Sequence, residues 1–275
     1  MILGIKMGNL QIDLISLVKV FFANYFLLSI RYILFAGIAY YIFWIWKKDK
    51  IQRFRIQEKF PEKKKILFEI KYSFLTFVIF SFVGVGIFTA KKLGYTKIYN
   101  NFSDYGFAYF VFSLVFLILF HDAYFYFTHR LMHHKLLFNS FHKVHHNSTN
   151  PSPWASFSFH PLEAIVEAGI LPISVMILPL HPITIISFIM FMTIMNIIGH
   201  LGYEFWSDSF VKSKLTNWNN TSTHHNMHHQ KYNCNYGLYF NWWDKLFGTN
   251  HEEYPREYER IVSKRKQEKQ ELALK

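Results

Sequence analysis

The strongest constraint on this chain is a segment of 26 residues, 121–146, that contains seven of its fifteen histidines. The segment holds an H-x-x-x-H pair followed by an H-x-x-H-H pattern. The histidines of these two patterns are His129, His133, His142, His145 and His146. On a helix, spacings of three and four residues place side chains on one face within a single turn. The segment therefore predicts imidazole groups that converge.

A second H-x-x-H-H pattern, His225, His228 and His229, occurs about eighty residues later. The three patterns together offer eight imidazoles, about twice the number of ligands that an ordinary zinc site uses. We interpret this number as suited to two metal ions. The alternative, a group of purely structural histidines, is disfavoured by their density. Cys234 is the only cysteine, which excludes a disulfide within the chain and any site built from several cysteines.

The apolar residues indicate a membrane protein. Hydrophobic residues are 51% of the chain, and they gather in long runs rather than spreading evenly. We expect membrane spans at 24–46 and 72–90, a third beginning at 106–120 and continuing as a helix through His133, and an out-and-back hairpin at 162–180 and 183–198. Residues 8–22 are expected along the membrane surface. Arg31 interrupts the first run and would extend to an interface if the span starts nearer Tyr32.

Charge predicts the orientation of the chain. Its net charge of +12 would suggest nucleic acid for a soluble protein, but the basic residues lie beside apolar runs, so we predict no nucleic-acid partner. Residues 47–71 contain ten Lys or Arg against four Asp or Glu, which predicts a cytoplasmic loop. Because the later hairpin crosses twice, all three histidine patterns are expected on the cytoplasmic side of a multi-pass membrane protein.

The expected fold is all-α, an integral membrane helical bundle with a cytoplasmic helical cap that carries a histidine-rich site for two metals. We expect three regions. Residues 1–105 would form N-terminal membrane helices and a basic cytoplasmic loop, 106–250 a catalytic domain, and 251–275 a charged C-terminal tail.

Several short motifs occur in a characteristic order between about residue 114 and residue 249. They are HR-x-x-HH at 129–134, H-K-x-HH at 142–146, FHPLE at 159–163, HH-x-x-HH at 224–229, NYG at 235–237 and WD-x-x-FGT at 243–249. In these motifs the chain resembles the fatty acid hydroxylase superfamily, also called the sterol desaturase family, and most of all its C-5 sterol desaturase branch. The resemblance covers roughly half of the chain.

This resemblance implies a non-haem di-iron centre, O2 as co-substrate and a lipid substrate taken from the bilayer. The implied enzyme is an oxidoreductase of the monooxygenase type that hydroxylates or desaturates a C–H bond of a sterol, fatty acyl, sphingoid or carotenoid lipid. The chain has no cysteine cluster, dinucleotide-binding glycine pattern or haem domain, so a separate reductase or electron-carrier protein is expected. Imidazole also suits zinc, copper and nickel, and the alternative function is membrane metal binding or transport without oxidase chemistry.

The expected metal ligands are the eight patterned histidines and a ninth, His200. Related fatty acid 2-hydroxylases have an extra H-x-x-x-H motif before the last pattern, and in this chain only His200 stands near that place. The nine expected ligands are His129, His133, His142, His145, His146, His200, His225, His228 and His229. His160 and His224 are further candidates, with packing or support of a ligand as the alternative. Asp122 is a candidate for orienting a ligand histidine, and Glu204 for either ligating a metal or supporting a ligand. Glu163 and Glu167 point either toward the metals or toward other helices. We expect no catalytic side chain beyond the metal ligands.

Overall fold

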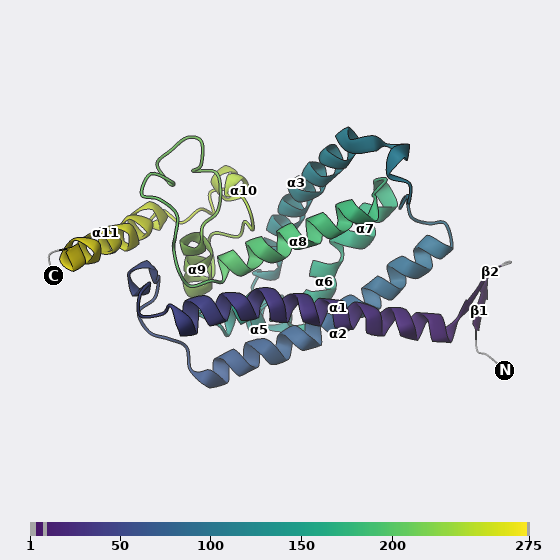
Figure 1. Ribbon diagram of the computed structural model, residues 1–275, viewed down its shortest axis with the longest axis horizontal. Helices are drawn as coiled ribbons and strands as arrows, with labels where there is room; N and C mark the ends of the chain where they lie inside the picture. The colour runs from purple at the N-terminus through teal and green to yellow at the C-terminus, as the bar shows by residue number, and fades with distance from the viewer. Residues whose placement is uncertain (1–3, 8–9, 274–275) are drawn as a thin grey trace.

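The computed structural model describes residues 4–7 and 10–273, and almost all of its regular structure is helical (Figure 1). A two-stranded antiparallel hairpin precedes the helices, formed by β1 (Gly4–Met7) and β2 (Leu10–Asp13). The long helices are α1 (Leu14–Tyr40), α2 (Lys63–Lys92), α3 (Gly106–Met132), α8 (Pro182–Gly199) and α11 (Tyr254–Ala273). The short helices are α4 (Phe138–Phe141), α5 (Lys143–His146), α6 (Pro161–Ala168), α7 (Ile170–Ile177), α9 (Ser222–Lys231) and α10 (Trp242–Leu246).

Four helices are long and apolar enough to cross a membrane, which makes this a multi-pass membrane protein. The candidate spans are Leu14–Trp46, Lys63–Lys92, Gly106–Met132 and Pro182–Gly199. The first span joins α1 to a π-helical turn, Tyr41–Trp46. Large apolar side chains such as Phe22, Phe82 and Phe107 are more than half exposed, as expected of surfaces that face lipid.

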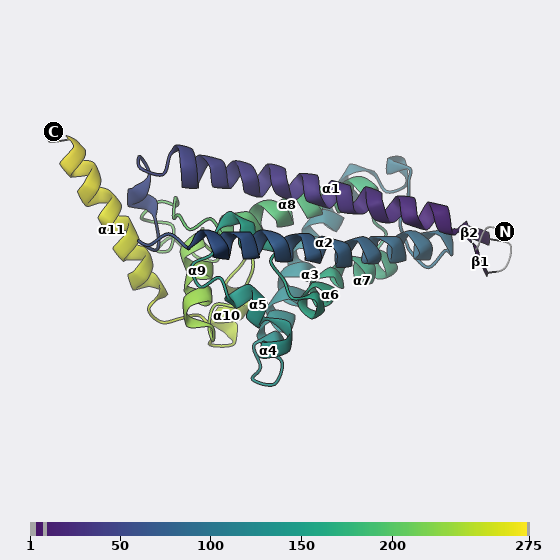
Figure 2. The ribbon, with the colours of Figure 1, turned by 90° about the horizontal axis from the view of Figure 1, so that it is seen from below.

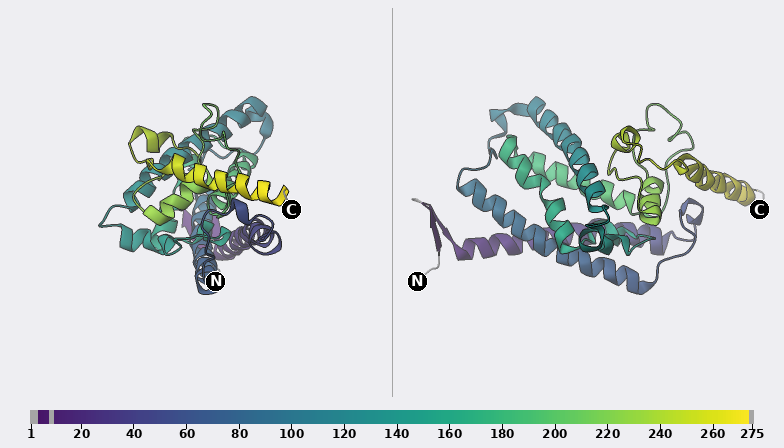
Figure 3. Two further views of the ribbon diagram at one scale, coloured as in Figure 1. Left: turned by 90° about the vertical axis from the view of Figure 1, so that its left-hand side faces the viewer. Right: turned by 180° about the vertical axis from the view of Figure 1, so that it is seen from behind.

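The second half of the bundle runs out and back. α6 and α7 lead away from the histidines, and α8 returns to them (Figures 1 and 3). At the turn, Tyr99 donates a backbone hydrogen bond to Leu180 across 3.2 Å, so this turn lies beside the connector between α2 and α3. Both arms begin with a His-Pro pair, in which the histidine Nδ1 caps the helix and proline occupies the first turn. The predicted hairpin is therefore present, although its first arm is divided into two helices at Gly169.

The central core joins the two halves of the chain. Figure 2 shows α1 and α2 extending along one side of the bundle. Tyr32 of α1 and Phe77 of α2 pack against Phe157, Ala164 and Ile197, which belong to later segments. The core therefore crosses the predicted boundary between residues 1–105 and 106–250, and this division of the chain stays a prediction.

Three expectations about local structure need correction. Of the predicted surface segment 8–22, residues 8–9 lie outside the described residues. Residues 14–22 form the first turns of α1 rather than a separate segment. The helix begins here because Asp13 Oδ1 caps it by accepting from Ser16 N at 2.7 Å. The helix that contains the first span thus begins earlier than residue 24, and Arg31 lies near the middle of this helix. The helix of the third span ends at Met132, so His133 is its cap.

Candidate metal centre

Nine histidines from four segments converge at one end of the bundle, where α3, α8 and the short helices α5 and α9 meet. They form two groups, and within each group the ligand nitrogens all lie within 4.8 Å of one another. The first group contains His129, His133, His142, His146 and His228. The second contains His145, His200, His225 and His229. These are the nine histidines expected from the sequence.

The paired histidines explain how the two groups come to be adjacent. His145 and His146 are neighbours on α5, and His228 and His229 are neighbours on α9, yet each pair is divided between the two groups. Consecutive residues on a helix point about 100° apart, because the helix has 3.6 residues per turn. Each H-H dipeptide therefore supplies one imidazole to each group, which an isolated histidine could not do.

Three histidines are held in a fixed tautomer by backbone carbonyl oxygens. His129 Nδ1 donates to the carbonyl of Tyr236 at 2.8 Å, and His228 Nδ1 to that of Cys234 at 2.6 Å. His200 Nδ1 donates to the carbonyl of Asn196 at 2.8 Å. These carbonyl oxygens can only accept, so each Nδ1 carries the proton and each Nε2 keeps its lone pair for a metal.

A fourth histidine is paired with a carboxyl group. His142 Nδ1 lies 2.7 Å from Glu163 Oε1, and both side chains are almost completely buried, which raises the pKa of Glu163 well above its ordinary value. When Glu163 is ionised it can only accept, and His129 and His142 then both present Nε2 lone pairs across a distance of 2.9 Å. Facing lone pairs repel unless a cation lies between them.

The separations between nitrogens also fit metal ions. In the second group, the Nε2 atoms of His200, His225 and His229 lie 3.1–3.2 Å from one another. Two nitrogen ligands, each about 2.1 Å from one ion, lie about 3.0–3.4 Å apart in octahedral or tetrahedral geometry. The residues present therefore fit two metal ions, one in each group.

Burial keeps these imidazoles neutral. Desolvation, followed by the neighbouring imidazoles, lowers the pKa of His145, His146 and His229 well below the ordinary histidine value. Burial lowers the pKa of His200 to about 4 and that of His133 to about 2. Neutral imidazole is the form that binds metals, so the site is ready for ligation at neutral pH.

Two other candidate histidines lie outside the groups. His160 Nδ1 accepts from Leu162 N at 3.3 Å and caps α6. His224 Nε2 is paired with Asn250 Oδ1 at 3.2 Å. Neither shares a metal-sized group with the nine histidines among the described residues.

The two candidate carboxylates support backbone rather than imidazoles. Asp122 Oδ1 accepts from the backbone amides of Tyr239 and Phe240 at 2.9 and 3.2 Å. Glu204 Oε2 accepts from the amide and hydroxyl of Thr223 in the first turn of α9, at 3.0 and 2.8 Å. In the structure, the carboxylate that meets a grouped histidine is Glu163.

The loop of residues 235–240 is a supporting element whose role the sequence only partly indicated. Asp244 accepts from the amides of Tyr236 and Gly237, each at 2.8 Å, and so shapes the loop whose Tyr236 carbonyl holds His129. A Cβ added at Gly237 would clash with the carbonyl oxygen of Phe240, so only glycine fits. The signal for this loop was its turn-rich NYG and WD motifs.

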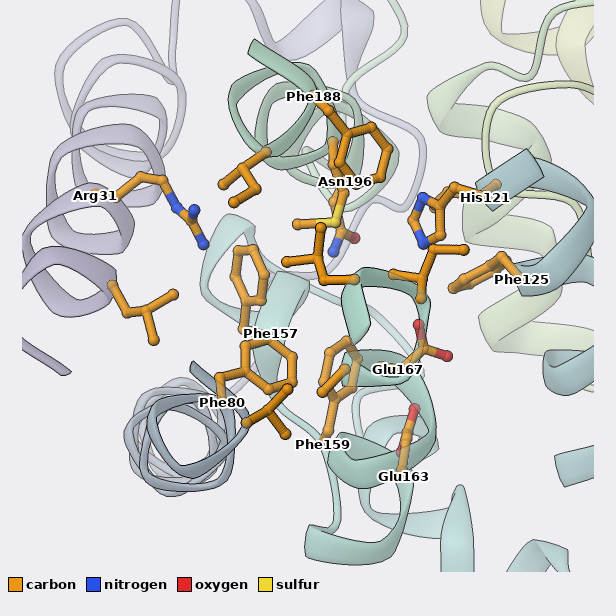
Figure 4. Close-up of a pocket in the computed structure, with 18 of the residues that line it drawn as sticks. Arg31, Phe80, His121, Phe125, Phe157, Phe159, Glu163, Glu167, Phe188 and Asn196 are labelled. Atoms are coloured by element: carbon orange, nitrogen blue, oxygen red, sulfur yellow. The ribbon is translucent and has the colours of Figure 1, made fainter. Parts of the chain in front are cut away.

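A largely apolar cavity leads to the histidines between α1, α2, α6 and α8. Its lining includes four of the grouped histidines: His142, His145, His200 and His225. Phenylalanine rings cover much of the remaining wall, including Phe80, Phe157, Phe159 and Phe188 (Figure 4). An apolar ligand in this cavity would lie directly beside the metal positions.

Comparison with known proteins agrees with this geometry. The family model described as fatty acid hydroxylase matches residues 114–249, a range that contains all nine grouped histidines. The chain belongs to the fatty acid hydroxylase family. Within this family it is similar to sterol desaturases.

The relatives of this fatty acid hydroxylase family member include three with informative names. A Delta(7)-sterol 5(6)-desaturase of Gibberella zeae is 28% identical over 219 residues, which are 80% of this chain and 64% of the relative. Lathosterol oxidase of Homo sapiens is 31% identical over 189 residues, 68% of this chain and 62% of the relative. A Delta(7)-sterol 5(6)-desaturase of Schizosaccharomyces pombe is 27% identical over 229 residues, 83% of this chain and 71% of the relative. The chain thus spans less than two thirds of the first two relatives. No solved structure matches significantly.

Proposed function

We propose that this protein is a membrane-bound oxidoreductase that uses two iron ions and O2 to hydroxylate or desaturate a C–H bond of a lipid. The observation that carries the proposal is the meeting of two histidine groups with one apolar cavity. The names of the relatives support a sterol-like or other lipid substrate. The family supports the choice of iron, since imidazole alone also suits zinc.

The nine grouped histidines would hold the two ions, five around one and four around the other. Bound irons would supply the electrons and the O2 activation needed to break an unactivated C–H bond. The protein itself positions the ligands. Glu163 and the carbonyls of Tyr236, Asn196 and Cys234 hold imidazoles in the tautomer that ligates.

The cavity would perform the second task, which is to place the lipid and exclude water. Its aromatic walls favour an apolar chain or ring, because burial of apolar surface contributes about 25 cal/mol per Å2. Hydroxylation and desaturation both begin with loss of a hydrogen atom. They differ in whether oxygen transfer or a second hydrogen loss follows, which depends on how the substrate lies.

The histidine end of the bundle is proposed to face the cytoplasm. The basic segment 47–71 reaches this end: Phe54 O accepts from Glu204 N at 2.7 Å, and Gln57 donates to Asn226 of α9 at 2.9 Å. Positively charged loops are retained on the cytoplasmic side, so the histidines would lie there too. A separate reductase or carrier protein would deliver electrons at this face.

Transport of metal ions is the less favoured function. A transporter needs ligands along a path through the membrane. Here the grouped histidines lie together at one end of the spans, beyond or at the ends of α3 and α8.

Lipid profiling tests the proposal directly. Cells that express the wild-type chain, His145→Ala or the control His134→Ala are grown in air, and their lipids are compared by mass spectrometry. His134 is exposed and adjoins a grouped histidine without belonging to either group. The wild type and the control should add one oxygen atom or one double bond to a lipid that His145→Ala leaves unchanged. Identical lipids in wild type and His145→Ala would contradict the proposal.

A further inference from the structure

The cavity has a polar wall that the metal chemistry does not use. Asn24, Leu28 and Arg31 of α1 all line it. They stand at positions i, i+4 and i+7, and therefore share one face of the helix. Figure 4 shows Arg31 pointing into the cavity from the wall opposite Glu163, the carboxylate that holds His142. A cation and the metal positions thus border the same apolar space.

Arg31 lies far from both ends of its helix. The first candidate span is Leu14–Trp46, so Arg31 has about fifteen helical residues on either side. At 1.5 Å per residue, each end is more than about 20 Å away. An arginine side chain is far shorter than this, so Arg31 does not reach either end of its helix, and its side chain lies at the wall of the cavity instead.

Arg31 also lacks a partner from the protein. Its guanidinium makes no hydrogen bond or ion pair with any of the described residues, and its Nε is buried without a partner. The guanidinium lies over the Phe157 ring, with 5.8 Å between Arg31 Cζ and the ring centre.

The titratable groups that face the cavity are Glu163, Glu167 and His121, in addition to the grouped histidines. Glu163 Oε1 is engaged by His142, and His121 Nδ1 lies 2.8 Å from the Tyr239 hydroxyl. Glu167 lies across the cavity from Arg31 (Figure 4) and forms no ion pair with it. The guanidinium is therefore left for a ligand.

A charge beside an apolar cavity is costly unless it is neutralised, and an ionisable residue within a membrane helix usually marks a functional site. The planar guanidinium binds carboxylate and phosphate through two parallel hydrogen bonds. A single neutral hydroxyl would satisfy neither the charge nor the five donors. The chemistry on this wall therefore favours an anionic head group over an uncharged one.

Gly84 of α2 lies directly behind Asn24. A Cβ at Gly84 would clash with Asn24 Nδ2, so the absent side chain leaves room for the amide. The amide adds a neutral donor and acceptor about two turns along the same helix face from the guanidinium. Together the two side chains form a polar end for an otherwise apolar cavity.

We propose that Arg31, assisted by Asn24, binds the carboxylate or phosphate head group of an amphiphilic lipid, whose apolar body extends across the cavity to the histidines. That this lipid is the substrate rests on the proposed function. Binding itself does not, and it is therefore testable without metal.

The test is a binding measurement on the full chain purified in a neutral detergent. The probes are a radiolabelled C18 fatty acid, the matched fatty alcohol and the matched alkyl phosphate, at a pH at which the acid is ionised. The proteins are wild type, Arg31→Gln, Arg31→Lys and the control Lys19→Gln, which removes an exposed cation from the same helix. The two anionic probes show whether carboxylate or phosphate is preferred.

Wild type should bind at least one anionic probe about tenfold or more tightly than the alcohol. Arg31→Gln should lose about tenfold to a hundredfold for that anion and leave alcohol binding unchanged, since a charged hydrogen-bond partner is removed. Arg31→Lys should retain part of the preference, and Lys19→Gln all of it.

Equal binding of the alcohol and of both anionic probes by wild type would overturn the inference, as would an equal loss of affinity for all three probes in Arg31→Gln. The same proteins assayed for lipid oxidation separate the two proposals. If the wild type oxidises a lipid but binds the anionic probes no more tightly than the alcohol, only the head-group site is refuted. If it prefers an anionic probe but oxidises no lipid, only the proposed enzymatic function is refuted.

Discussion

The hydrogen bond between Glu163 and His142 offers a sharp test of how the metal ligands are held. His142 Nδ1 and Glu163 Oε1 lie 2.7 Å apart, and the Glu163 side chain is almost fully buried beside the first histidine group. Replacement by leucine removes the acceptor, so the His142 imidazole loses both its fixed tautomer and its orientation. A hydrogen bond to a charged group contributes about 1.5–3 kcal/mol. Loss of a partner that orients a ligand reduces metal affinity by about tenfold to a hundredfold.

We therefore expect Glu163→Leu to weaken metal binding within this range, and Glu163→Gln to weaken it less, because its amide oxygen still accepts a hydrogen bond. The assay is competition for the metal with a chelator of known affinity, monitored on the purified chain. Glu167→Gln is the matched control, since Glu167 lines the same cavity and hydrogen-bonds to no grouped histidine among the described residues. Metal affinity that is the same in wild type and Glu163→Leu would refute the reasoning.

The supporting groups around the histidines give three more predictions. Asp244→Asn removes a charged acceptor from the Tyr236 and Gly237 amides and should lower the free energy of unfolding by about 2–4 kcal/mol. It should also reduce metal affinity more in the first histidine group, which contains His129, than in the second; an equal loss of affinity in both groups would argue against it. Gly237→Ala forces a Cβ against the Phe240 oxygen and should lower the free energy of unfolding, measured by denaturant titration, by about 1–3 kcal/mol. In the control Gly86→Ala the added Cβ meets no atom within 4 Å, so the free energy of unfolding should change little. In metal-free protein, the buried His200 has a pKa of about 4, whereas a histidine of the unfolded chain takes up a proton below about pH 6.5. The free energy of unfolding should therefore be greatest above pH 6.5 and fall toward pH 4, by up to about 1.4 kcal/mol per pH unit for each such histidine. A free energy of unfolding that does not change across this range would contradict the prediction.

Convergence of the histidines was predictable from their helical spacing and from their number, which exceeds what one ordinary metal site needs. The division into two groups was not, since it depends on the direction in which His145 and His146 leave the short helix α5. Their role as ligands stays a prediction. The four spans were also predictable, because long apolar runs are strong signals.

Long-range polar contacts could not be foreseen from the sequence. Its place on the helix of His129 predicts that Asp122 orients a histidine, but Asp122 accepts from the amides of Tyr239 and Phe240, more than a hundred residues away in the sequence. The place of Arg31 on the cavity wall likewise depends on later segments, such as Phe157, that pack against α1. Periodicity reports which residues share a face, but not which distant segment packs against that face.

The number of metal ions per chain tests the central claim most directly. Total transition metal is measured by elemental analysis on purified wild type, on His200→Ala, which removes one ligand of the four-histidine group, and on His134→Ala as control. We predict two ions per chain in wild type and control, and one retained ion in His200→Ala. A single ion in the wild type, or an unchanged pair in His200→Ala, would contradict the account of two adjacent histidine sites.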